Sequence, residues 1–117
     1  MSAGIKDIEI EVGATFEMDV LWKDPDGNPI DNTGYSAHMQ IRKKYGDATV
    51  ILEFSTDNTA IVLDGASGYI HVTGLANLTE AVTQRYGVYD LKMFSPDGKV
   101  YRIMKGAVDF DPEATIT

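Results

Sequence analysis

The clearest signal along the chain is an alternation of apolar and polar side chains with a period of two residues. Over residues 15–22, the apolar set stands at every second position: Phe16, Met18, Val20 and Trp22. Because successive side chains of a strand point to opposite faces, only a strand gathers these four on one side. The pattern predicts a half-buried strand with Trp22 on the core face.

Three further runs repeat this alternation. Residues 35–42 place Tyr35, Ala37, Met39 and Ile41 on one face and polar side chains on the other. Residues 8–12 and 50–54 follow the same rule, and each run is bounded by Gly, Asp, Asn or Ser. Such punctuated, alternating runs predict three more strands.

Turn chemistry predicts two hairpins. The short β-branched runs 60–63 and 69–73 are joined by Asp64-Gly65-Ala66-Ser67-Gly68, whose residues tolerate positive φ. Runs 88–94 and 99–104 flank Ser95-Pro96-Asp97-Gly98, in which proline presets the first turn position and glycine accepts the left-handed one. Each pair of runs is therefore expected to be antiparallel.

A single helical signal lies between the hairpins. Within residues 74–85, apolar side chains recur at spacings of three and four, and Thr79-Glu80 is a candidate start for one helical turn. The apolar positions are Leu75, Leu78, Ala81 and Val82. At most one short helix is expected here.

Turn signals thus recur about every 8–14 residues, with no long helical pattern between them. This arrangement predicts an all-β fold, namely an immunoglobulin-like antiparallel β-sandwich of about seven to eight strands. Residues 1–117 are expected to form one domain, with a core over 15–110 and an acidic tail over 111–117. Because Pro112 interrupts the acidic end of the chain, that end is either a last edge segment or a docking tail.

Composition narrows the function classes. Eighteen Asp and Glu against ten Lys and Arg give a net charge of −8, which opposes binding to nucleic acid or to an anionic membrane. The sequence has no cysteine, so disulfides, thiolate nucleophiles and Cys-type zinc sites are excluded. The first seven residues lack a secretory-signal pattern, and no apolar run approaches the ~20 residues of a bilayer span.

One acidic loop has a superficial likeness to a Ca²⁺ site. It places four oxygen-bearing side chains close together: Asp24, Asp26, Asn28 and Asp31. Because two prolines stiffen this loop and strands flank it, turn formation explains these residues better than metal binding. The alternating Asp109, Asp111 and Glu113 are likewise expected to be a solvated surface.

No catalytic or cofactor-binding constellation is predicted. His38 and His71 fall in predicted strands, and a third ligand for a familiar zinc set is missing from the sequence. No Gly-x-Ser-x-Gly elbow or similar nucleophile signature is present. We therefore expect no catalytic residue, no metal ligand and no cofactor-binding residue in this sequence.

Protein contacts are the remaining candidate chemistry. Arg42, Lys43 and Lys44 form a basic cluster followed by Tyr45, and Tyr86 is one of six tyrosines in a small domain. Tyrosine and arginine are enriched at protein interfaces. These five residues are the candidate interface residues.

Four segments carry a resemblance to a known family. They are PIDNTGYSAHMQIR at 29–42, GYIHV at 68–72, GVYDL at 87–91 and GKV at 98–100. Together they resemble the immunoglobulin-like N-terminal domain of tailed-phage baseplate upper proteins and related small phage and prophage virion proteins. The resemblance extends over residues 15–110 and consists of short, chiefly architectural motifs.

The resemblance implies a non-enzymatic structural or adaptor protein of a phage baseplate, tail or neck. It implies other virion proteins as partners, a symmetric homo-oligomer in the particle, and location in the virion after assembly in the host cytoplasm. Because no fibre-forming segment follows Thr117 in the sequence, a stand-alone adaptor, collar or capsid decoration subunit is expected. Two alternatives remain: a carbohydrate- or ligand-binding sandwich, and a small hydrolase whose residues converge only in three dimensions.

Overall fold

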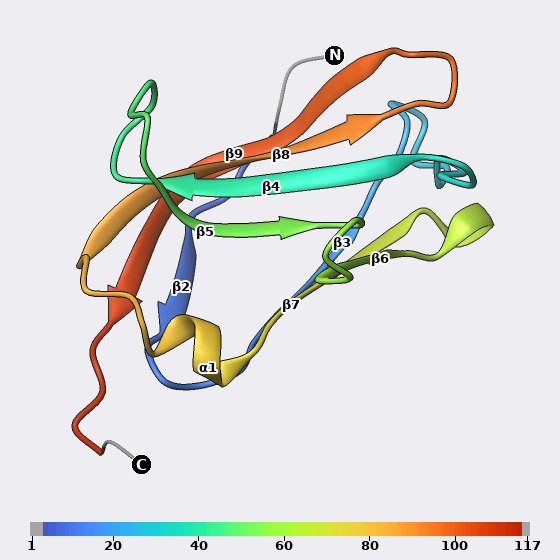
Figure 1. Ribbon diagram of the computed structural model, residues 1–117. Coiled ribbons are helices and arrows are strands. Elements are labelled where there is room, and N and C mark those ends of the chain that lie inside the picture. The colour runs from blue at the N-terminus through green and yellow to red at the C-terminus, as the bar shows by residue number, and fades with distance from the viewer. Residues whose placement is uncertain (1–3, 116–117) are drawn as a thin grey trace.

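The computed structural model describes residues 4–115 as two β-sheets packed face to face (Figure 1). The last two residues of the predicted acidic tail, Ile116 and Thr117, and the first three residues of the predicted domain lie outside the described residues. Sheet A contains β1 (Gly4–Ile5), β2 (Ile8–Glu11), β4 (Ser36–Arg42), β5 (Val50–Ser55), β8 (Tyr86–Phe94) and β9 (Val100–Asp111). Sheet B contains β3 (Phe16–Leu21), β6 (Ile61–Leu63) and β7 (Tyr69–Gly74).

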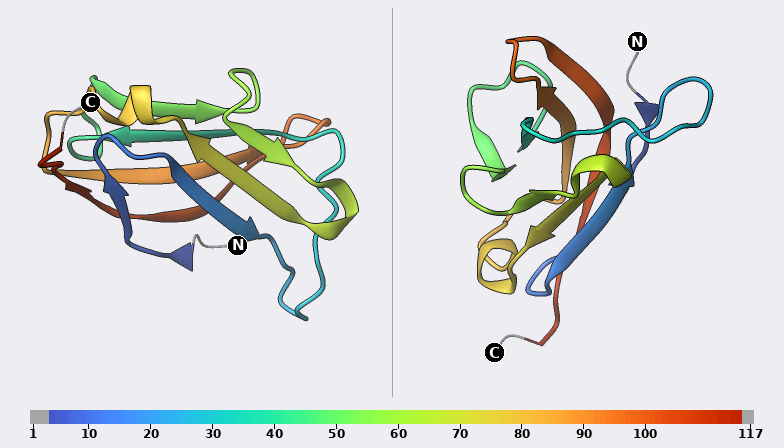
Figure 2. Two further views of the ribbon diagram at one scale, coloured as in Figure 1. Left: turned by 90° about the horizontal axis from the view of Figure 1, so that it is seen from below. Right: turned by 90° about the vertical axis from the view of Figure 1, so that its right-hand side faces the viewer.

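The strand order is that of an immunoglobulin-like sandwich, which confirms the predicted fold class. In sheet B, β3, β7 and β6 occupy the places of strands B, E and D. In sheet A, β4, β8 and β9 occupy the places of C, F and G, and β5 extends the sheet beyond β4. Viewed from below, the strands of sheet B run obliquely across those of sheet A (Figure 2).

The N-terminal edge of sheet A differs from the antiparallel expectation. Both β1 and β2 pair with β9 in parallel, with Gly4 opposite Met104 and Ile8 opposite Val108. Alternation and turn residues predict only pairing between sequence neighbours, so this long-range pairing had no signal in the pattern. Because the ladder is interrupted at Lys6 and Asp7, the N-terminal run counts as two strands, and residues 4–115 contain nine strands, one more than the seven to eight expected.

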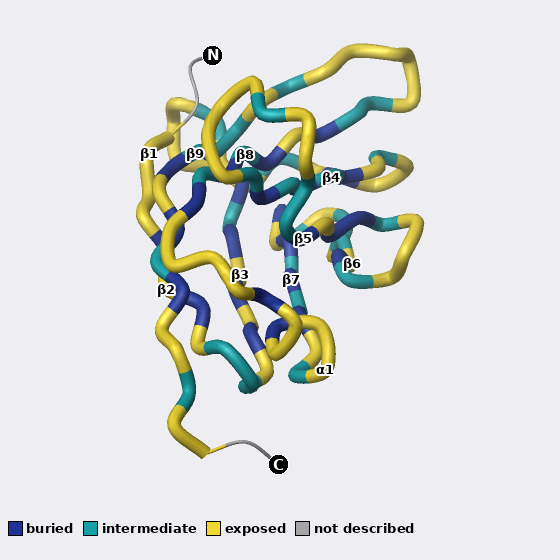
Figure 3. Tube along the Cα trace, turned by 60° about the vertical axis from the view of Figure 1, so that its left-hand side comes forward, coloured by how far each residue is buried: buried dark blue, intermediate teal, exposed yellow. Residues whose placement is uncertain are grey.

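The core follows the alternation and lies between the two sheets, where the buried residues of facing strands meet (Figure 3). Sheet A contributes Met39, Ile41, Leu91 and Met93, while sheet B contributes Met18, Val20, Ile70 and Val72. Trp22 is 5% exposed and its ring packs edge-on against Tyr35, 5.5 Å between centroids. The predicted inward position of Trp22 is confirmed, and the core also includes Ile8 and Ile10, ahead of residue 15.

The two predicted hairpins form as expected. β6 and β7 pair antiparallel, and the 3₁₀ turn η1 (Gly65–Ser67) lies between them. β8 and β9 pair antiparallel through a turn in which the Gly98 N–H donates to the Ser95 carbonyl at 3.1 Å. Gly98 has a φ of 90°, the left-handed conformation that the turn requires. β9 ends at Asp111, directly before Pro112, so the prediction that the proline ends a strand is confirmed. The edge position predicted for that segment is wrong, because β2 pairs with β9 up to Asp111.

The short helix is present, but its predicted start is wrong. α1 (Ala76–Thr79) ends where Thr79-Glu80 was expected to begin a turn. The buried Thr79 hydroxyl donates to the Ala14 carbonyl at 2.8 Å and accepts the Gly13 N–H at 3.2 Å, which ties this end of the helix to the β2–β3 turn. Leu75 and Leu78 are consequently turned outward, 57% and 45% exposed. Among the described residues, no helix is long and apolar enough to cross a membrane.

A buried tyrosine holds the interrupted N-terminal strand against the sheet. The Tyr89 hydroxyl donates to the Lys6 carbonyl at 2.6 Å, and the Asp7 carboxylate accepts the Ala107 N–H at 3.0 Å. At Gly106, an added Cβ would lie 2.1 Å from the same Lys6 oxygen, so only glycine allows this approach. Burial, the nearby Asp7 and Tyr45 together raise the pKa of Tyr89 to about 12.

We therefore expect Tyr89→Phe to lower the free energy of unfolding by about 1 kcal/mol, because the hydrogen bond from the Tyr89 hydroxyl to the Lys6 carbonyl is lost. The matched control is Tyr86→Phe at an exposed position, which should change it by no more than about 0.5 kcal/mol. Urea denaturation measures both, and equal effects would contradict this role for Tyr89.

The raised pKa gives a second readout of the same contact. The folded state favours the neutral phenol of Tyr89. The stabilisation that this preference contributes to folding is complete below the unfolded-state pKa of about 10, and it is lost as pH rises towards the folded-state pKa of about 12. The loss of stability over this pH range should be steeper in the wild type than in Tyr89→Phe.

Candidate functional site

The outer face of sheet A carries a groove above β4 and β8. Its larger part encloses about 220 Å³ and its smaller part about 130 Å³. The two parts share Gln40, Asp90 and Lys92, so they form one continuous depression, which we call the sheet A groove. Its remaining lining residues are His38, Arg42, Tyr45, Gly46, Val88, Tyr89 and Phe94.

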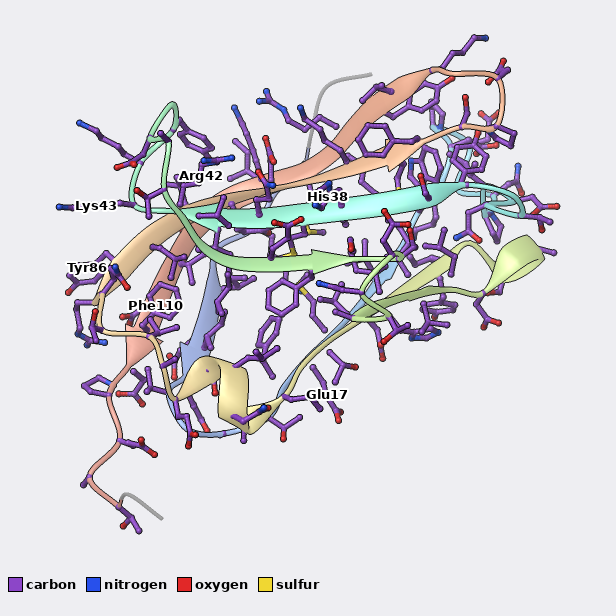
Figure 4. The ribbon with its side chains drawn as sticks, viewed as in Figure 1. Glu17, His38, Arg42, Lys43, Tyr86 and Phe110 are labelled. Atoms are coloured by element: carbon purple, nitrogen blue, oxygen red, sulfur yellow. The ribbon has the colours of Figure 1, made fainter. Side chains whose placement is uncertain are left out.

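Strand register places these side chains together. Gln40 lies opposite Asp90, and His38 lies opposite Lys92, in the antiparallel pairing of β4 with β8. Because the intervening residues Met39 and Leu91 point into the core, the polar set must point outward. Figure 4 shows His38 and Arg42 projecting from β4 on the side away from sheet B, whereas Glu17 lies on the opposite side of the sandwich.

Two of the predicted interface residues shape one end of the groove. The Arg42 guanidinium donates to the Asp47 carbonyl and to the Gln40 side-chain oxygen, both at 2.7 Å. Tyr45 is 54% exposed, and its hydroxyl lies 3.3 Å from the Tyr89 carbonyl and 3.5 Å from that of Gly106. Tyr45 thus reaches from the β4–β5 loop across β8 towards β9 and forms a wall of the groove.

The other three predicted interface residues lie around the same end. Lys43 and Lys44 are exposed in the loop that follows β4. Tyr86 begins β8, one outward position before Val88, and is 66% exposed. The Arg85 guanidinium lies 5.4 Å from the Tyr86 ring centroid and forms an ion pair with Asp109 at 2.8 Å. Figure 4 shows Arg42, Lys43 and Tyr86 at the same end of sheet A. Lys44 and Tyr45 follow Lys43 directly in the β4–β5 loop, so all five candidates lie in this region.

The acidic loop between β3 and β4 uses its carboxylates as turn acceptors. Asp24 Oδ1 accepts the N–H groups of Asp26 and Asn28 at 3.0 and 2.9 Å. Asp31 Oδ1 accepts the N–H and the hydroxyl of Thr33, and these hydrogen bonds lower the pKa of Asp31. Within residues 4–115, no group of three metal-ligating side chains is placed to hold an ion.

Both histidines pair with carboxylates. His38 Nε2 contacts Glu53 Oε1 on the outer face of sheet A. On the outer face of sheet B, His71 Nδ1 lies 2.7 Å from Asp19 Oδ1 and Nε2 lies 3.8 Å from Asp64 Oδ2, while the ring stacks on Tyr69. The hydrogen bond to Asp19 is the main cause that raises the pKa of His71. Sequence reasoning missed this cluster because Asp19 and His71 meet only through the β3–β7 register.

Charge is distributed unequally over the two outer faces. On sheet A, the region formed by β4, β5, β8, the first half of β9 and the β4–β5 and β8–β9 loops carries seven basic and four acidic residues, and we call it the basic face. The basic residues are Arg42, Lys43, Lys44, Lys92, Lys99, Arg102 and Lys105, and the acidic residues are Asp47, Glu53, Asp90 and Asp97. Beyond it, where β9 pairs with β2, the outward side chains are the acidic Glu9, Glu11, Asp109 and Asp111.

The outer face of sheet B, which we call the acidic face, has the opposite character. Its strands present Glu17 and Asp19, Asp64 follows β6, and none of the outward strand positions in the described part of the sheet is Lys or Arg. At one end of this face, Leu75 and Leu78 line a depression of about 400 Å³ with Ala60 and Thr73. Two exposed leucines beside acidic side chains are unusual for an unpartnered surface.

Comparison with known proteins leaves the family open. No family model matches the chain, and no curated protein sequence matches it.

We expect Asp19→Asn to lower the pKa of His71 towards its ordinary value of 6.5, because the main partner of the imidazolium loses its charge. Asp64→Asn, which changes a carboxylate 3.8 Å away, should have a smaller effect. NMR titration of the imidazole resonances measures both. An unchanged His71 titration in Asp19→Asn would contradict the pairing.

The same pairing predicts a small pH effect on stability. Since the folded-state pKa of His71 is raised, the stabilisation is complete below about pH 6.5 and is lost as pH rises through the folded-state value. Because the side chains of His71 and Asp19 are both substantially exposed, this stabilisation should stay below about 1 kcal/mol.

Proposed function

We propose that this chain is a non-enzymatic structural or adaptor protein of a tailed-phage virion, located in its baseplate, tail or neck and acting through protein–protein contacts. The observation that best supports the proposal is that the segments carrying the family resemblance form the fold which that resemblance implies. GVYDL lies within β8. β7 begins at Tyr69, the second residue of GYIHV, and β4 covers residues 36–42 at the end of the 29–42 segment. These strands pair within an immunoglobulin-like sandwich.

The segments that carry the resemblance also make contacts that hold the fold together. In the 29–42 segment, Asn32 is buried, its N–H donates to the Gly65 carbonyl at 3.1 Å, and its side-chain amide donates to the Tyr69 carbonyl at 3.1 Å. Asn32 thereby joins the β3–β4 connection to the β6–β7 turn. A motif with this role supports a shared architecture, while the outer faces supply the contacts that would differ between family members.

The candidate site favours binding over chemistry. The sheet A groove is lined by Arg42, Lys92, Asp90, Gln40 and aromatic rings. The Arg42 guanidinium donates to the Gln40 side-chain oxygen at 2.7 Å, and Asp90 forms an ion pair with Arg102 at 3.9 Å. Both histidines have their closest side-chain contact with a carboxylate rather than with a hydroxyl. Such a surface suits a polar protein interface with aromatic anchors.

The sugar-binding alternative receives less support. An exposed aromatic platform would stack on a sugar ring, but Trp22 is buried against Tyr35 and Tyr101. The capsid-decoration alternative uses the same outer faces and differs only in the position of the protein on the particle. Location on the particle therefore distinguishes it from the leading proposal.

Virions purified from cells that carry the gene test the proposal directly. We expect quantitative mass spectrometry to find the chain at a fixed ratio to the major tail and capsid proteins, and immunogold labelling to place it on the tail or baseplate. Labelling confined to the head would favour a decoration protein. Absence of the chain from complete virions would overturn the proposal.

A further inference from the structure

We propose that the acidic face of sheet B receives the basic face of a second copy of this chain, so that copies associate head to tail. This inference rests on the proposed structural role and names the partner of its surfaces. It is carried by three observations: an exposed apolar depression, the charges around it, and an oppositely charged face elsewhere on the same chain.

The apolar part of the acidic face requires a partner of matching character. Leu75 and Leu78 expose about half of their surface at the depression beside Thr73, and Val62 is exposed on the same sheet. Glu17 lies opposite Thr73 in the β3–β7 pairing, which places a carboxylate beside one of the lining residues of the depression. An occupant that buries these leucines should therefore combine apolar surface with positive charge.

The basic face offers that combination. It exposes Tyr45 and Val100 together with Lys92, Arg102 and Lys105. Apart from Tyr45 in the β4–β5 loop, these residues lie on strands of the sheet, so binding orders few side chains beyond the lysines and arginines themselves. Because the two faces lie on opposite sides of the sandwich, their contact joins different surfaces of two copies (Figure 4). Such a heterologous contact propagates into rings or stacks.

Edge pairing is the obvious competing route, and the structure blocks part of it. β5 forms a free edge of sheet A, but the Asn58 side chain occupies two of its outward backbone groups. Asn58 Oδ1 accepts the Ser55 N–H at 3.0 Å, and Nδ2 donates to the Glu53 carbonyl at 3.1 Å. Because these two backbone groups already have partners, they are not available to pair with a strand of another copy. The outer faces are therefore better placed for self-association than the β5 edge.

Salt dependence is the first expected property. Between about 0.1 M and about 1 M NaCl the screening length falls from about 10 Å to about 3 Å, which weakens contacts between exposed charges. In sedimentation equilibrium, the purified protein should exceed the monomer mass at the lower salt concentration and approach it at the higher one. A protein that stays monomeric at low salt and high concentration would overturn the proposal.

Two charge-reversal variants test the direction of the contact. Lys92→Glu with Arg102→Glu removes the basic face, and Glu17→Lys with Asp64→Lys removes the acidic face. Each variant alone should associate at least about a hundredfold more weakly than the wild type, because like charges then meet. Lys6→Glu with Lys23→Glu changes the net charge as the first variant does but lies outside the basic face, and should associate like the wild type.

Mixing the two variants tests whether the two faces bind each other. Each variant retains one intact face, and the two reversed faces also carry opposite charges, so an equimolar mixture should recover the association that each variant alone has lost. If the mixture stays monomeric while circular dichroism shows both variants folded, the proposal is wrong. Nucleic-acid binding by the wild type that Lys92→Glu with Arg102→Glu abolishes, without self-association, would also overturn it.

These outcomes are independent of the virion experiment. If the chain is found in virions but its variants fail to pair, the structural role stands and the head-to-tail interface is wrong. If the variants pair as expected but the chain is absent from virions, the interface stands and the phage assignment is wrong.

Discussion

The two-residue pleat of the strands is the constraint on which the rest of this structure depends. Each strand can bury only one of its two faces, so two sheets must pack together to form a core. Met39 and Ile41 of β4 and Ile70 and Val72 of β7 meet that requirement, since all four are buried. The same pleat sends every intervening residue outward. The surfaces available for function are therefore the two outer faces and the few unpaired edges.

That constraint also explains how the outer faces acquired different characters. Outward positions do not affect the core, so their side chains can vary in charge without loss of the fold. On β3 they are Glu17 and Asp19, whereas β8 and β9 contribute Lys92, Arg102 and Lys105. The net charge of −8 conceals this difference, because it sums an acidic face with a region in which basic residues prevail. A chain with a negative net charge can thus still present two faces of complementary charge.

Sequence reasoning predicted the features that local pattern determines. The inward position of Trp22, the two hairpins and the all-β class all follow from alternation and turn residues. The outward rotation of Leu75 and Leu78 could not be predicted, because it depends on hydrogen bonds of Thr79 to a turn more than sixty residues away. The parallel pairing of β2 with β9 and the meeting of His71 with Asp19 are also long-range. For the candidate site, the pattern named Arg42 and Tyr45, while the groove between them came from strand register.

The central claim is that the two outer faces of this sandwich, rather than a pocket with catalytic groups, are its working surfaces. Zero-length carbodiimide cross-linking of an equal mixture of ¹⁴N- and ¹⁵N-labelled protein tests it most directly. The account predicts mixed-isotope cross-links that join Lys92 or Lys105 of one copy to Glu17 or Asp64 of another. Mixed-isotope cross-links confined to other surfaces, or only links within one copy, would contradict it.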